Sequence, residues 1–99
     1  MTPESRKALK QALVECLEPA AEIKRIVIFG SFLTSPSPND IDVAIFQDSA
    51  DGYLPLALKY RRMARLVAER LPLDIIPLRS DAVGEFAAAI NAGEVIYQR

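Results

Sequence analysis

The chain has 99 residues, of which 51% are hydrophobic and 25% are charged, a composition typical of one globular domain with residues 1–99 in a single unit. Twelve Lys and Arg residues against thirteen Asp and Glu residues provide no positive field for a nucleic acid, so duplex DNA is not an expected partner. No apolar run reaches the length of a membrane span and the first residues lack a signal-peptide pattern, so we expect a cytoplasmic protein without a membrane partner.

The first predicted helix begins at Pro3 and ends near Glu18. Thr2 offers a capping oxygen, and proline is favoured at the first helical position. Apolar residues then recur on one face at helical spacing: Leu9, Leu13, Cys16 and Leu17. This pattern favours Cys16, the single cysteine, as a buried structural thiol rather than a nucleophile.

Two predicted strands follow, over residues 24–29 and 40–46. Both are apolar and rich in β-branched residues, and Gly30 marks a turn directly after the first. Between them, residues 32–39 contain two prolines and two serines, which predicts a structured connector.

After a polar loop, residues 53–70 have the pattern of one long amphipathic helix. Its expected buried stripe consists of Leu56, Tyr60, Met63, Val67 and Leu71. A third strand is predicted over residues 73–78. Proline cannot donate to a sheet ladder, so Pro77 predicts that this strand lies at a sheet edge or ends there.

A last helix is predicted between Ser80, as its cap, and Gly93, as its stop. Four residues would share its buried face: Val83, Phe86, Ala87 and Ile90. Residues 95–97 would add a short final strand. The resulting order, α-β-β-α-β-α with this added strand, predicts a small α/β domain.

Three aspartates stand in apolar frames, a placement that requires metal, hydrogen bonds or positive charge to offset desolvation. Taken alone, Asp40 fits a turn residue, Asp74 fits a solvated strand end, and Gly30 with Ser31 fits an ordinary strand-to-turn junction. Asp42 lies further into its strand and has no turn to explain it. Together these five residues predict a site.

The spacing of the acids indicates the chemistry of that site. Residues i and i+2 of a strand project from the same face about 6.6 Å apart, so Asp40 and Asp42 would repel each other unless cations lie between them. Magnesium prefers hard oxygen ligands and completes its shell with phosphates. Asp74, on a neighbouring strand, would add a third ligand and could deprotonate an acceptor hydroxyl. Gly30 and Ser31 would supply backbone amides and a hydroxyl to a triphosphate.

The motifs Phe29-Gly30-Ser31, Asp40-Ile41-Asp42 and Asp74 resemble those of the nucleotidyltransferase superfamily that includes DNA polymerase β. Residues 93–97 are also similar to the end of the minimal nucleotidyltransferases of bacteria and archaea, which consist of the catalytic domain alone. The resemblance covers roughly residues 20–97. It implies a small mixed sheet of three to four strands with helices packed against it.

The resemblance also implies an activity: transfer of a nucleoside monophosphate, AMP from ATP, to a hydroxyl, with two magnesium ions. Asp40, Asp42 and Asp74 match the catalytic, metal-binding carboxylates, and Gly30 and Ser31 match the nucleotide-binding turn. Many minimal members are antitoxins that silence a HEPN-domain toxin by binding or adenylylating it. A HEPN-type protein is therefore an expected partner or acceptor.

Three functions remain open at this stage: an enzyme, an interaction module of the antitoxin type that has lost turnover, and a nucleotide sensor. Related proteins usually carry a further glycine, and often arginine, after Gly-Ser, whereas residues 32–35 contain neither. Without a local positive charge the turn should bind a triphosphate less tightly.

A cluster of basic residues could compensate if it bordered the carboxylates, although a solvated helix face is the expected role: Lys59, Arg61, Arg62, Arg65, Arg70 and Arg79. Tyr53 and Tyr60 are candidates for stacking on a base, with Tyr60 expected in the core.

Overall fold

The computed structural model describes all 99 residues, as five helices and one four-stranded sheet. In chain order the elements are α1 (Pro3–Leu17), β1 (Ile23–Phe29), α2 (Ser31–Thr34), β2 (Ile41–Gln47), α3 (Tyr53–Met63), α4 (Arg65–Arg70), β3 (Leu73–Arg79), α5 (Glu85–Asn91) and β4 (Glu94–Gln98). The strand order is β3-β2-β1-β4. β2 and β3 are parallel and the other pairs are antiparallel, which confirms the predicted mixed sheet with helices against it.

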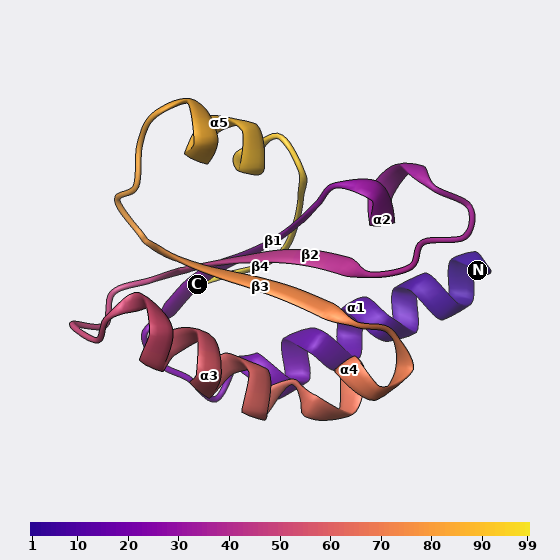
Figure 1. Cartoon of the computed structure of the whole chain (residues 1–99), viewed down its shortest axis with the longest axis horizontal. Helices are drawn as coiled ribbons and strands as arrows, with labels where there is room; N and C mark the ends of the chain where they lie inside the picture. Colours follow the sequence, from indigo (N-terminus) through magenta and orange to yellow (C-terminus); the bar gives the residue numbers. More distant parts are fainter.

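The helices cover the two faces of the sheet unequally. Helices α1, α3 and α4 lie on one face, while the short α5 lies on the other and α2 stands beside the sheet at one end (Figure 1). Alternate residues of β2 divide between these layers: Ile41, Val43 and Ile45 belong to the large core on the α1, α3 and α4 side. Ala44 and Phe46 belong to a small cluster with Ile90 of α5. The α5 side therefore leaves part of the sheet uncovered.

The predicted stripe of the long helix faces the core, but the helix is interrupted. Tyr60 is fully buried, while Met63 and Leu71 pack against the core from partly buried positions. At Ala64, which is completely buried, the backbone turns to φ −97° and ψ 17°, and the Val67 N–H bonds to the Ala64 carbonyl in the tighter i to i+3 pattern. The single helix expected over residues 53–70 is therefore two helices, because this tight turn separates them.

A partly buried carboxylate, Glu22, joins α3 to the loop before β1. Lys59 Nζ and Tyr60 Oη each donate a hydrogen bond of 2.8 Å to Glu22 Oε2. Burial of Glu22 opposes its ionisation, yet these hydrogen bonds hold its pKa below the ordinary value. Tyr60 is thereby fixed in the core and is not free to stack on a base.

The prediction for the last helix was wrong at its start. Ser80 does not cap it: the Ser80 hydroxyl bonds to Asp48, and the helix begins at Glu85 after Gly84, whose φ is +112°. Val83 precedes the helix and is 91% exposed, whereas Phe86 lies within α5 and is still 58% exposed. Of the predicted buried face only Ala87 and Ile90 are core residues.

Other boundaries agree more closely with the expectations. β3 lies at the sheet edge, as Pro77 predicted, and the final strand is present as β4. The first residues of the expected connector are helical in α2, and Cys16 packs against the core while only partly buried. None of the helices combines the length and the apolar composition that a membrane span requires.

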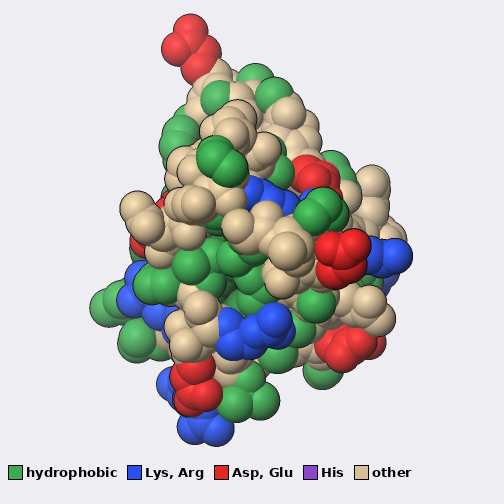
Figure 2. Space-filling model, turned by 90° about the vertical axis from the view of Figure 1, so that its right-hand side faces the viewer, with side chains coloured by type: hydrophobic (Ala, Val, Ile, Leu, Met, Phe, Trp, Pro, Cys, Tyr) green, Lys and Arg blue, Asp and Glu red, His purple; other side chains and the backbone are tan.

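Charges of both signs are mixed on one face of the molecule. On the face that forms the right-hand side of Figure 1, acidic and basic side chains alternate with apolar ones, and no large area carries a single sign (Figure 2). This distribution agrees with the near balance of charges in the sequence.

Candidate functional site

The three aspartates of the sequence motif meet at one end of the sheet. Asp42 and Asp74 are partners in the parallel ladder between β2 and β3, and Asp40 lies immediately before β2. Each residue places a carboxylate oxygen within 4.8 Å of the others. Because Asp40 and Asp42 are two residues apart on an extended chain, they project from the same face, as the strand periodicity predicts.

The turn after β1 is built against this acidic group. Phe29 pairs with Asp42 in the antiparallel ladder, so Gly30 follows directly beside the carboxylates. Gly30 adopts φ +79° and ψ −154°, a conformation open only to glycine, and an added Cβ would lie 2.3 Å from Asp42 Oδ2. Ser31 begins α2 and is exposed. A side chain at position 30 would therefore fill the space at the Asp42 carboxylate.

The electrostatics of the group leave negative charge uncompensated. Burial, and then the neighbouring charges of Asp40 and Asp74, raise the pKa of Asp42 above its ordinary value. None of the protein's four ion pairs involves these carboxylates. Three hard oxygen donors that repel one another and lack a basic partner fit the requirements of a divalent cation such as magnesium.

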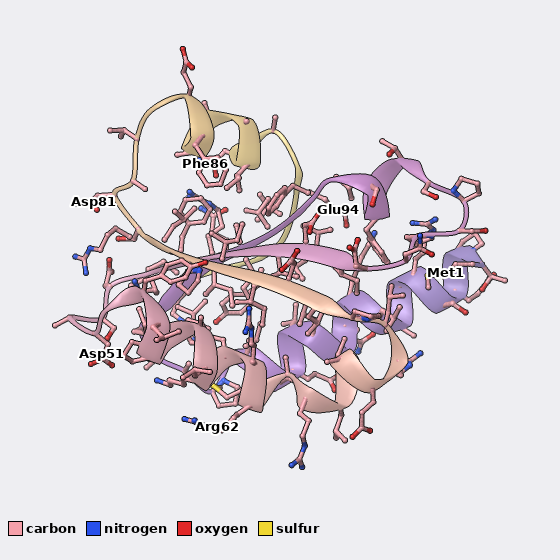
Figure 3. The ribbon with its side chains drawn as sticks, in the orientation of Figure 1. Met1, Asp51, Arg62, Asp81, Phe86 and Glu94 are labelled. Carbon is pink, nitrogen blue, oxygen red and sulfur yellow. The ribbon has the colours of Figure 1, made fainter.

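The basic cluster predicted on the long helix does not border the carboxylates. Asp42 projects from the opposite face of β2 to Ile41 and Val43, which pack toward α1, α3 and α4, so α3 and α4 lie across the sheet from the acidic group. Arg62 points from α3 away from the sheet (Figure 3). Lys59 instead pairs with Glu22. These residues form a solvated surface, and the exposed Tyr53 lies at the start of the same helix.

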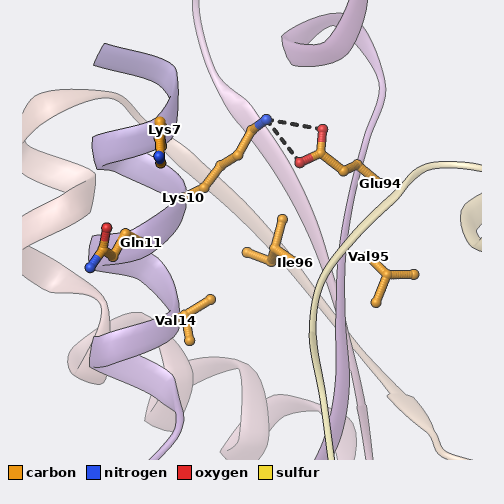
Figure 4. Close-up of a pocket in the computed structure, with 7 residues that line it drawn as sticks. All are labelled: Lys7, Lys10, Gln11, Val14, Glu94, Val95 and Ile96. Carbon is orange, nitrogen blue, oxygen red and sulfur yellow. Dashed lines mark hydrogen bonds and ion pairs between the residues drawn. The ribbon is translucent and has the colours of Figure 1, made fainter. Parts of the chain in front are cut away.

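The acidic group is partly exposed, since Asp40 and Asp42 are half-buried and Asp74 is exposed. The three hollows of the protein surface are lined by other residues. The largest, of about 420 Å³, lies between α1 and β4, where Lys10 pairs with Glu94 and Val14 faces Ile96 (Figure 4). A molecule bound at the aspartates would meet two partly buried carboxylates and the exposed Asp74.

One residue that contacts the segment after the Gly30–Ser31 turn was not anticipated from the sequence. Arg6, in the first turns of α1, donates hydrogen bonds to the carbonyl oxygens of Phe32 and Ser35. No local pattern relates residues so far apart in the sequence. From the sequence alone, an arginine at that helical position is expected on a solvated surface. Only the folded chain, in which the Arg6 side chain reaches α2, shows the contact.

The fold and the acidic group together define a carboxylate-bearing α/β domain whose Gly-Ser turn follows its first strand. Residues 11–99 match the family model described as "Polymerase beta, Nucleotidyltransferase". The chain belongs to this family, as the motifs predicted. No curated protein and no solved structure matches the chain significantly.

Proposed function

We propose that the protein is a magnesium-dependent nucleotidyltransferase that moves AMP from ATP to a hydroxyl group of a partner protein. The observation that carries the proposal is the convergence of three carboxylate oxygens within 4.8 Å beside a glycine that leaves space for them. Membership of the nucleotidyltransferase family supports a transferase reaction with a nucleotide substrate.

Asp40, Asp42 and Asp74 are the residues that would hold the metal, in the two-ion arrangement that many phosphoryl-transfer sites use. Magnesium, when bound, would offset the charge of the triphosphate and acidify the attacking hydroxyl. Asp42 is partly buried, and burial, followed by the repulsion from Asp40 and Asp74 that a cation would relieve, raises the pKa of its carboxyl. Gly30 and Ser31 would contact the triphosphate through backbone amides and the Ser31 hydroxyl.

In the proposed reaction the acceptor oxygen forms a bond to the α-phosphorus of ATP while the bond from that phosphorus to the β-phosphate oxygen breaks. Pyrophosphate leaves, and the acceptor hydroxyl loses its proton. Asp74 is the proposed proton acceptor, because its exposed side chain lies within reach of its two neighbours and can pass the proton to water.

The open position of the carboxylates supports a macromolecular acceptor. None of the three surface hollows is lined by these residues, and a hydroxyl on a protruding segment of another protein could approach the exposed Asp74. A HEPN-type protein is the partner suggested by the resemblance to minimal nucleotidyltransferases.

The test compares ATP labelled at the α-phosphorus with ATP labelled at the γ-phosphorus. Each is incubated with magnesium, the protein and the product of the neighbouring gene, and protein-bound label is measured after electrophoresis. Nucleotidyl transfer predicts label on the acceptor from the α position only, because the γ-phosphate leaves in pyrophosphate. Asp42→Asn should abolish labelling while circular dichroism shows an intact fold.

The same experiment evaluates the interaction module predicted as an alternative. If neither label is transferred and Asp42→Asn still binds and neutralises the partner, the enzymatic proposal is wrong and the protein acts by binding. If ATP binds but is not cleaved with the partner present, the protein acts as a nucleotide sensor. Calorimetric titration of magnesium and ATP separates these two outcomes.

A further inference from the structure

Arg6 connects the N-terminal helix to the short segment that follows the Gly-Ser turn. Its two terminal nitrogens donate to different carbonyls, those of Phe32 and Ser35. The guanidinium also lies 5.1 Å from the centroid of the Phe32 ring. Arg6 is partly buried and pairs with no carboxylate, so its donors are directed at this segment.

The segment held by Arg6 has little stability of its own. α2 has only four residues and no side-chain cap, and a single helical turn does not persist in isolation. Its internal bonds run from the Leu33 N–H to the Gly30 carbonyl and from the Ser35 N–H to the Ser31 carbonyl. The carbonyls that accept from Arg6 lie near the end of this turn, where intrahelical partners are missing.

The position of this segment determines the position of Gly30. The buried side chain of Phe32, 1% exposed, anchors α2 in the large core, and the guanidinium of Arg6 lies over its ring. Gly30 is only two residues away and approaches Asp42 so closely that an added Cβ would lie 2.3 Å from Oδ2. A displacement of α2 would therefore move the backbone of residues 30 and 31 relative to the carboxylates.

We propose that Arg6 is a positioning residue that holds the Gly30–Ser31 turn in place for the nucleotide, by bridging the carbonyls of Phe32 and Ser35. The inference rests on the proposed function and assigns a role to a residue that precedes the matched family region, residues 11–99. Residues 32–35 contain no basic side chain, so α1 supplies to this segment a charged group that the segment itself lacks.

Bridging requires the shape of arginine as well as its charge. The planar guanidinium presents several donors in a fixed fork and can reach two carbonyls at once, whereas lysine carries a compact charge on a flexible stem. Lysine at position 6 would preserve the field near the turn without fixing the two carbonyls. The Arg6→Lys variant therefore separates positioning from simple electrostatic attraction of the phosphates.

The experiment measures MgATP binding by calorimetry for the wild type, Arg6→Gln, Arg6→Lys and the control Lys7→Gln. Lys7 is the neighbouring exposed cation on α1 and forms no ion pair, so its replacement removes the same charge without touching α2. Both Arg6 variants should bind MgATP about tenfold more weakly, the equivalent of one charge-assisted hydrogen bond. Lys7→Gln should match the wild type, and all chains should stay folded by circular dichroism.

Several outcomes would overturn the inference. If Arg6→Lys binds MgATP with wild-type affinity, the positive charge alone suffices. If Arg6→Gln and Lys7→Gln lose the same amount of MgATP affinity, the effect is likewise one of charge and not of position. If the wild type binds no MgATP, the proposed function fails, and amide exchange at Leu33 and Ser35 still tests the bridge. Faster exchange confined to these amides in both Arg6 variants supports a positioning role, whereas unchanged exchange excludes it.

Discussion

Replacement of Asp42 with asparagine should stabilise the metal-free protein at neutral pH, although it removes a residue proposed to be essential. Two unit charges 4.8 Å apart repel by about 0.9 kcal/mol at the dielectric constant of water. This dielectric constant is appropriate because the three carboxylates reach solvent. Asp42 has two such neighbours, Asp40 and Asp74, so asparagine should gain about 1–2 kcal/mol. For a domain of this size each kcal/mol corresponds to about 4–8 °C in Tm.

The effect should depend on pH in a defined direction. The pKa of Asp42 is higher in the folded protein than its ordinary value, because of burial and the two neighbouring carboxylates. Below the unfolded-state pKa the carboxyl is protonated in both states and costs nothing. The penalty develops as pH rises through the unfolded-state and then the folded-state pKa, so asparagine should stabilise at pH 7 and lose its advantage in strong acid.

Magnesium should reverse the order of stability. A ligand that binds only the folded state at a hundred times its Kd adds about 2.7 kcal/mol, and the wild type should gain from this while Asp42→Asn should not. Thermal unfolding with magnesium or with a chelator measures both effects, and Asp51→Asn, which removes an exposed carboxylate elsewhere, is the control. The reasoning is refuted if Asp42→Asn lowers Tm in chelator at pH 7, since the carboxylate would then form a stabilising contact.

Two further substitutions test other parts of the structure. Gly30→Ala forces alanine into a glycine-only conformation and places its Cβ against Asp42, so we expect a loss of about 1–3 kcal/mol in urea unfolding, together with weaker magnesium binding in calorimetry. Wild-type stability in this variant would contradict the close approach. Glu22→Gln weakens the bonds from Lys59 and Tyr60 and should cost about 1 kcal/mol at pH 7. The pKa of Glu22 is lowered in the folded state, so the ionised carboxylate stabilises the fold above the unfolded-state pKa, and this stabilisation is lost as pH falls through the folded-state pKa. The role of Glu22 would be disproved if the stability difference between the wild type and Glu22→Gln kept the same size in strong acid.

The sequence alone predicted the elements whose signals are local. Alternation along residues 40–46 set the two faces of β2, and Pro77 placed β3 at an edge, because a missing donor cannot be accommodated inside a ladder. The same alternation put Asp40 and Asp42 on one side of the chain. The family was likewise evident from short motifs whose spacing survives without the rest of the structure.

Tertiary packing decided what local patterns could not. The helix expected over residues 53–70 divides at Ala64. Val83 is exposed because α5 begins only after Gly84, and Phe86 is exposed although it lies within α5. Periodicity records which side of an element is apolar and contains no information about whether another layer covers it.

The relations between distant residues also came only from the folded chain. Asp74 meets Asp42 because a parallel crossover brings β3 beside β2 in one register, and the basic residues of α3 and α4 are separated from both by the sheet. Arg6 reaches the Phe32 carbonyl because the fold brings the start of α1 within the reach of an arginine side chain from α2. Such contacts depend on the order and direction of the strands, which the whole hydrophobic core determines at once, so no single segment of the sequence specifies them.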